Sequence, residues 1–206
     1  MICFQRFSYP EYRKYTIEDR LSGIEDQGEL GSCTAQSIVK LVEQQIILFM
    51  LRQGYSLKEI TTRSDLQLFL NRSRIFLYHV TVYRVLHEEG DVGATINAAL
   101  LALKKFGVPC EEEWPYLVER FGKEPPEAIY ELARNCRAEK YYRLDISTLS
   151  DRQLVKLMKA HLIAGIPLAY GFLVFNNSIR NAARSGKIAY PGKRDWVAGG
   201  HAIVAC

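Results

Sequence analysis

One cysteine stands in a setting suited to nucleophilic chemistry. In "DQGELGSC", Asp26 to Cys33, two glycines and a serine crowd before the thiol, and Gln27 lies six residues upstream. The apolar run that follows predicts a helix beginning near Cys33. A thiol attacks only as the thiolate, and the first turn of a helix favours negative charge through its unpaired N–H groups. The pattern therefore predicts a reactive thiol, with Gly28 and Gly31 letting the loop backbone approach a ligand.

One histidine could accept the proton of that thiol. The chain has four histidines, and His79, His87 and His161 lie in helical patterns where a partly exposed surface role is expected. His201 instead follows two glycines and opens a short apolar run, so its ring could lie at the edge of a sheet. A histidine that takes the proton would complete an ion pair with the thiolate. On the residues alone, an inert thiol and a structural histidine stay open as the alternative.

The elements that would position these two residues change in character along the chain. Helices are expected over 33–52, with Ser32 as N-cap, and over 74–88, 95–106, 124–140 and 147–165. Strands are expected at 166–175 and 199–206, with a short extended piece at 187–192. The sequence thus predicts an α+β fold with a helical lobe at about 20–140 and a β lobe at about 141–206. A cleft between two such lobes is a natural place for a site.

Composition excludes several other functions. The chain has 206 residues, is 48% hydrophobic and carries a net charge of +4, without the basic stripe of a nucleic-acid binder. It contains no uncharged run of the ~20 apolar residues that a membrane span needs. The N-terminus shows no signal-peptide core, so we expect a cytoplasmic protein. The five cysteines are odd in number and lack zinc-ligand spacing, so neither a disulfide framework nor a metal site is expected.

Several segments together resemble the papain-like cysteine peptidases. "DQGELGSCTAQS" is similar to the nucleophile motif of that family and "GGHAIVAC" to its histidine motif. "GATINAALLALKKFGVPCEEEWPY" is similar to the segment from the cleft glycine to the Tyr/Trp-Pro-Tyr signature, and "LVKLMKAHLIAGIPLAYGFLV" to the opening of the second lobe. The resemblance covers about residue 20 to the end. Thr34 after the nucleophile is typical of a microbial branch that lacks the disulfides of the secreted enzymes.

The resemblance implies one papain-like peptidase domain over 1–206, made of a helical lobe and an antiparallel β lobe that is incomplete at the C-terminus. It implies Cys33 as nucleophile, His201 as general base and acid, and Gln27 as a donor to the oxyanion. The implied substrate-binding residues are Gly31, Ser32, Gly93 and Gly200. The implied partner is a polypeptide substrate, with neither metal nor cofactor required, and the oligomeric state stays open.

The resemblance is incomplete at both ends of the chain. The family has an asparagine that orients the histidine on a later strand, and no match to that motif follows His201. We therefore expect a fragment of a longer protein, with a truncated and impaired relative as the alternative. The N-terminal "FQRFSYPEYRKY" is expected either to lie over the cleft or to pack as a tail.

Three functions fit these residues. The first is an endopeptidase that works through a Cys–His pair and an acyl-enzyme. The second uses the same pair for acyl or isopeptide transfer. The third is a pseudoenzyme that binds peptide without cleaving it, and the missing asparagine is its best support.

Overall fold

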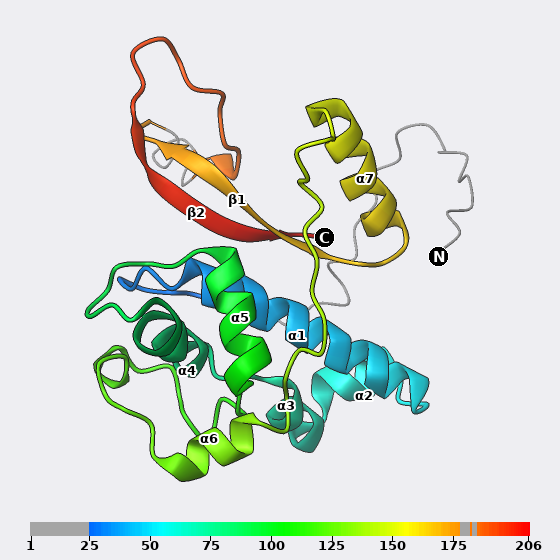
Figure 1. Ribbon diagram of the computed structural model, residues 1–206. Helices are drawn as coiled ribbons and strands as arrows, with labels where there is room; N and C mark the ends of the chain where they lie inside the picture. Colours follow the sequence, from blue (N-terminus) through cyan, green and yellow to red (C-terminus); the bar gives the residue numbers. More distant parts are fainter. Residues whose placement is uncertain (1–24, 178–181, 183–184) are drawn as a thin grey trace.

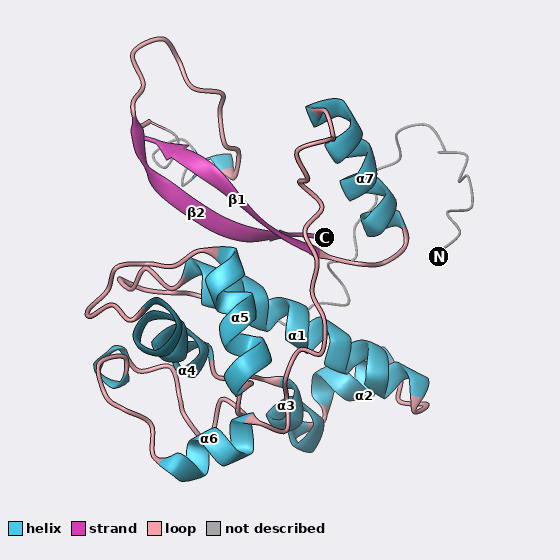
Figure 2. Cartoon of the chain, viewed as in Figure 1, coloured by secondary structure: helices cyan, strands magenta, loops and turns pink. Residues whose placement is uncertain are grey.

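A helical layer and a two-stranded sheet make up the described part of the molecule. The computed structural model describes residues 25–177, 182 and 185–206. In Figure 1 the two strands lie across one side of the helical layer, and α7 stands beside the strands, apart from the other helices. Cys3 and the N-terminal segment "FQRFSYPEYRKY" lie outside the described residues. The predicted α+β class is confirmed, with antiparallel strands (Figure 2).

The helices precede the strands along the chain, as predicted. They are α1 (Cys33–Arg52), α2 (Leu57–Thr62), α3 (Ser64–Leu70), α4 (Arg74–His79), the π-helix η2 (Val80–Leu86), α5 (Ile96–Phe106), the 3-10 turn η3 (Val118–Arg120), α6 (Glu127–Ala133) and α7 (Asp151–Ile163). The helix expected over 124–140 is shorter than predicted. The helices α2 and α3 were not predicted, although Ser56 and Glu59 form a capping box at the start of α2.

Helix α1 is the central element of the helical layer. Its side chains Ile38, Val39 and Ile47 are almost fully buried, as the apolar positions on most of its faces predict. The layer packs α4 and α5 against α1, and Phe76 and Tyr78 of α4 have no exposed surface. Burial of these apolar side chains stabilises the position of α1 and therefore the position of its first residue, Cys33.

The segment predicted as one helix over 74–88 is α-helical only as far as His79, and it continues as a π-helix that ends at His87 with a left-handed backbone (φ 57°). The surface role expected for His79 is wrong, because the residue is 2% exposed. Its Nδ1 lies 2.7 Å from the Phe121 carbonyl oxygen and its Nε2 lies 3.2 Å from Glu124. Each ring nitrogen therefore has an acceptor within hydrogen-bond distance, and buried polar groups generally have such partners.

The sheet consists of β1 (Leu168–Phe175) and β2 (Val197–Ala205), paired antiparallel. Phe172 pairs with His201, and Gly171 pairs with Ala202. Ala202 is buried, and both strands contact α1. The sheet therefore rests on the helix that begins at Cys33. No helix in the described part of the chain is long and apolar enough to span a membrane.

Gly107 ends α5 at a point where only glycine fits, and this gives a test of the layer. Its φ is 81°, and an added Cβ would lie 1.9 Å from the Ala133 carbonyl oxygen. Gly54 also has a positive φ, of 95°, but an added Cβ there meets nothing. We expect Gly107→Ala to lower the free energy of unfolding by about 3 kcal/mol or more, and Gly54→Ala by about 1 kcal/mol, measured by urea denaturation. Equal losses would contradict this packing.

Candidate active site

Cys33 is the first residue of α1, and its side chain is partly exposed. The first helical hydrogen bond runs from the Gln36 N–H to the Ser32 carbonyl oxygen, at 3.0 Å, so the preceding N–H groups have no partner within the helix. Ser32 occupies the predicted N-cap position, but its side chain makes no capping hydrogen bond. The N–H groups of the first turn therefore receive no hydrogen bond from the cap side chain.

The Ser32 hydroxyl is engaged by Tyr116 instead. Ser32 has no exposed surface, and its Oγ lies 2.6 Å from the Tyr116 hydroxyl. That hydroxyl donates its single proton to the Gln27 carbonyl oxygen at 2.8 Å, so the Ser32 hydroxyl is the donor in the first contact. One tyrosine thereby holds both ends of the loop that leads to Cys33. Burial raises the pKa of Tyr116, which keeps the hydroxyl protonated.

Tyr116 is itself fixed by a pair of charged residues. Its N–H donates to Glu111 at 2.6 Å, and the Arg74 guanidinium lies 5.1 Å from the centre of its ring. Arg74 also pairs with Glu111, at 3.2 Å, and with Glu25. Burial raises the pKa of Glu111, although Arg74 and the Tyr116 N–H oppose this shift. Arg74, at the start of α4, and Glu111 thus hold Tyr116 in place, and Tyr116 holds the loop.

The side chain of Gln27 turns back onto its own loop. Its Nε2 donates to the Leu30 carbonyl oxygen at 2.8 Å. A side-chain amide has two N–H groups, so one remains for a ligand. This places a candidate oxyanion donor in the segment that leads directly to Cys33.

The other side of the loop meets the segment before α5. The Gly31 N–H donates to both oxygens of Asp91, at 2.9 Å each, and the Tyr78 hydroxyl donates to the same carboxylate. The Gly93 N–H in turn donates to the Tyr78 hydroxyl at 3.0 Å. Gly31 and Gly93, both predicted to bind substrate, are therefore neighbours. Because the N–H of each is already engaged, only their carbonyl oxygens are available to pair with a peptide.

His201 reaches the same region from the sheet. Its ring packs edge-on against Phe172, with the ring centres 5.8 Å apart, and β2 contacts α1. Within the described residues the His201 ring and the Cys33 thiol form no hydrogen bond with each other. The structure therefore brings their elements together but leaves the predicted ion pair unformed. Gly200 precedes His201 in β2, and an added Cβ there would meet nothing.

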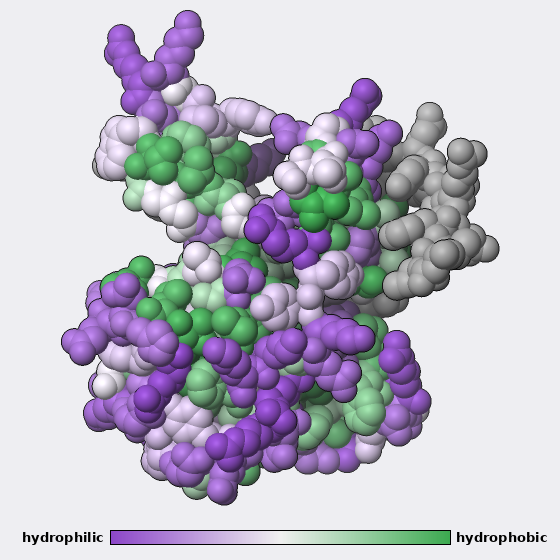
Figure 3. Space-filling model, in the orientation of Figure 1, coloured by the Kyte–Doolittle hydropathy of each residue, from purple (hydrophilic) through white to green (hydrophobic). Residues whose placement is uncertain are grey.

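Figure 3 shows the molecule hollowed between the β1–β2 hairpin and the helical layer. On the helical side, a pocket of about 540 Å³ opens beside Gly93. Its lining combines apolar and polar side chains with exposed backbone, from Leu86, Glu88, Val92, Gly93, Ala94 and Thr95. A pocket next to the Gly31–Gly93 contact is suited to the side chain of an extended ligand.

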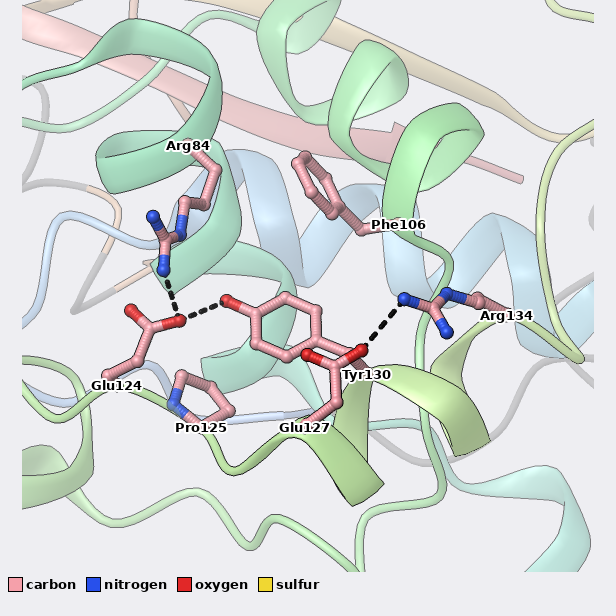
Figure 4. A pocket seen from close by; sticks show the side chains of 7 residues that line it. All are labelled: Arg84, Phe106, Glu124, Pro125, Glu127, Tyr130 and Arg134. Atoms are coloured by element: carbon pink, nitrogen blue, oxygen red, sulfur yellow. Dashed lines mark hydrogen bonds and ion pairs between the residues drawn. The ribbon is translucent and has the colours of Figure 1, made fainter.

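A second pocket, of about 490 Å³, lies between η2 and α6 (Figure 4). Its charged residues bind one another: Arg84 contacts Glu124, and Arg134 contacts Glu127 at 2.9 Å. These pairs leave no charged group that points at a ligand, so this pocket is a weaker candidate. Across the described ranges, no three His, Cys, Asp or Glu side chains gather to hold a metal ion.

Several residues of the site were not predicted. Asp91, Tyr78 and Arg74 touch the loop or its supports, and nothing in their local sequence indicates this. Glu111 and Tyr116 belong to the "EEEWPY" segment, which the sequence marks only as similar to a family signature. The roles assigned to Cys33, His201 and Gln27 stay predictions, and so do the substrate contacts of Gly31, Ser32, Gly93 and Gly200.

Tyr116→Phe removes the hydroxyl that bridges Gln27 and Ser32. We expect the free energy of unfolding to fall by about 1 to 3 kcal/mol, because two hydrogen bonds at a partly buried position are lost. Tyr190→Phe is the matched control, since Tyr190 is 98% exposed. Urea denaturation of both variants measures the effect, and equal stabilities would contradict a bridging role.

Glu111→Gln tests the buried carboxyl through pH. The folded state raises the pKa of Glu111, so the stability from this group is complete below its ordinary pKa and is lost as pH rises through the folded value. Glutamine stays neutral throughout. We therefore expect the difference in unfolding free energy between the variant and wild type to shift in favour of the variant as pH rises above about 4. Glu113→Gln, at an exposed position, is the control. A shift in favour of wild type as pH rises would show that Arg74 lowers the pKa of Glu111 more than burial raises it.

The chain was compared with known proteins by sequence and by structure. No family model matches the chain. An uncharacterized peptidase C1-like protein of Acanthamoeba polyphaga mimivirus is 31% identical over 194 residues, which cover 92% of this chain and 57% of that protein. The chain thus spans a little over half the length of the curated relative it matches.

Solved structures agree with that relative. Xylellain, a cysteine protease from Xylella fastidiosa, aligns with a TM-score of 0.65 and 26% identity, over 95% of this chain and 66% of that one. A structure from work on the mite allergens Blo t 1 and Der p 1 aligns with a TM-score of 0.49 and 15% identity, over 96% of this chain and 57% of that one, which is too weak to support an argument. In fold and in sequence, this chain is thus similar to the papain-like cysteine peptidases.

Proposed function

We propose that this chain carries the thiol chemistry of a cysteine peptidase, with polypeptide as substrate. The Cys33 sulfur attacks a peptide carbonyl, and His201 takes the thiol proton. The carbon–nitrogen bond breaks, His201 gives the proton to the leaving amine, and an acyl-enzyme remains. Water activated by His201 then hydrolyses the thioester and regenerates the thiol.

The observation that carries this proposal is the placement of Cys33. It opens the first turn of α1 without a side-chain cap, and the strand that holds His201 contacts the same helix. A helix start stabilises the thiolate, and a nearby imidazole is the usual base. Apart from Phe172, no described residue is seen to orient the His201 ring, so closure of the pair on substrate is part of the proposal.

The oxyanion of the tetrahedral state would be held by two donors. One is the Cys33 N–H at the start of α1, and the other is the second amide hydrogen of Gln27, whose first is used by Leu30. Such donors act on charge that appears only in the transition state. The loss of one typically costs about 100- to 1000-fold in rate.

The substrate would lie extended in the hollow between sheet and helices. The free carbonyl oxygens at Gly31 and Gly93 would pair with its backbone, and the pocket beside Gly93 would receive a side chain. Backbone pairing places few demands on sequence, so the pocket would supply the selectivity.

Thiol labelling tests the proposal. We expect an epoxide-bearing peptide at about pH 6 to label the chain once, at Cys33, with intact mass giving the number of labels and peptide mapping the position. Cys33→Ala abolishes the label and His201→Ala slows it, because the imidazole stabilises the thiolate.

Cys136→Ala is the matched control. Burial raises the pKa of the Cys136 thiol, so its removal should leave the labelling rate unchanged. Slow labelling spread over several cysteines, or a His201→Ala variant that labels at the wild-type rate, would overturn the proposal.

A further inference from the structure

Asp91 is an acidic residue that no sequence motif singled out, and it lies on the segment between η2 and α5. It is exposed as a residue, yet its carboxylate accepts three hydrogen bonds. Two come from one N–H, that of Gly31, and the third comes from the Tyr78 hydroxyl. A carboxylate held this way joins the loop before Cys33 to the helical layer.

The Gly31 N–H belongs to the Leu30–Gly31 peptide, which also carries the acceptor for Gln27. The Leu30 carbonyl oxygen accepts a hydrogen bond from Gln27 Nε2 at 2.8 Å, and the Gly31 N–H donates one to Asp91 at 2.9 Å. A peptide unit is planar, so fixing one end fixes the direction of the other. A charged acceptor at the N–H also polarises the carbonyl and strengthens the hydrogen bond that it accepts.

Tyr78 gives the carboxylate a rigid support. The Tyr78 side chain is fully buried, and its ring stacks on Phe121 with centres 4.6 Å apart. Burial and the Asp91 hydrogen bond both raise the pKa of Tyr78, so the hydroxyl remains a donor. Because the ring cannot move without disturbing the core, the position of Asp91 follows from that of α4.

The space around Gly31 fits the same arrangement. An added Cβ at Gly31 would lie 3.0 Å from the Asp91 Oδ1, 3.3 Å from the Tyr78 hydroxyl and 3.4 Å from the Gly93 Cα. The carboxylate therefore reaches this N–H because residue 31 lacks a side chain. Three segments meet at this point with no room for a further atom.

The geometry points to Asp91 as a positioning residue: through the Leu30–Gly31 peptide it sets the direction of the Gln27 side chain. The catalytic consequence rests on the proposed function, because it requires Gln27 to stabilise an oxyanion. The structural part stands independently of any activity.

Amide hydrogen exchange measured by NMR on the full chain tests the structural part. We expect the Gly31 amide and the Gln27 side-chain amide to be protected in wild type. In Asp91→Ala both exchange about 10- to 100-fold faster, since a hydrogen bond to a charged group is lost. Asp91→Asn keeps one carbonyl acceptor and falls between. Glu89→Gln, which removes a nearby charge without a hydrogen bond in the structure, matches wild type.

Peptide hydrolysis tests the catalytic part. We expect Asp91→Ala to lower kcat by about 10- to 100-fold with KM little changed, because the lost interaction acts in the transition state. In a Gln27→Ala background the same change should cost about threefold or less, because Asp91 acts through Gln27. Labelling of Cys33 by iodoacetamide needs no oxyanion and should stay at the wild-type rate in Asp91→Ala.

The two proposals fail in different ways. If wild type neither labels rapidly at Cys33 nor cleaves peptides, the proposed function is wrong, and amide exchange still decides the role of Asp91. If wild type is active but Asp91→Ala leaves the exchange of both amides unchanged, the positioning role is wrong. It is also wrong if Asp91→Ala costs as much with Gln27→Ala as without it.

Discussion

The candidate site depends on how the loop from Gln27 to Ser32 is held. This loop has no regular secondary structure, so its backbone polar groups need partners from elsewhere. The Tyr116 hydroxyl donates to the Gln27 carbonyl oxygen, and the Asp91 carboxylate, held by the Tyr78 hydroxyl, accepts from the Gly31 N–H. Both rings are anchored in the helical layer, which makes the shape of the loop a property of that layer. The loop leads directly to Cys33, whose own position follows from the burial of α1.

His201 depends on a different element and a different constraint. Its position follows from the pairing of β1 with β2, in which Phe172 faces His201 and the buried Ala202 faces Gly171. A slip of one residue would exchange the two faces of the strand. The proposed nucleophile and its proposed base are thus held by separate parts of the fold, which meet where the strands contact α1.

The charged residues that support the site are partly buried, and they are paired with one another. Arg74 contacts both Glu25 and Glu111, and the buried His79 has a partner at each ring nitrogen. Removing one member of such a pair leaves the other unsatisfied in a poorly solvated place, which costs more than the pair itself contributes. These residues therefore restrict the layer to one arrangement of α4, Tyr116 and the loop.

The sequence by itself predicted most of the elements and pointed to Cys33 and His201 as the candidate reactive pair. Periodicity and turn residues predicted α1, α5, α7 and β1 closely, since those signals are local. The spacing of glycines around Cys33 and before His201 indicated both residues without any structure. The short helices α2 and α3, the π-helix and the burial of His79 were missed, because each depends on contacts with residues far along the chain.

Tertiary structure alone decided how the loop is supported. Asp91 lies 60 residues from Gly31, and Tyr116 lies 89 residues from Gln27. An exposed aspartate between glycines carries no local signal, because its partner is a single backbone N–H and its support is a buried hydroxyl. Hydrogen bonds of this kind are specified by where whole helices pack, and packing depends on the entire core rather than on any short stretch of sequence.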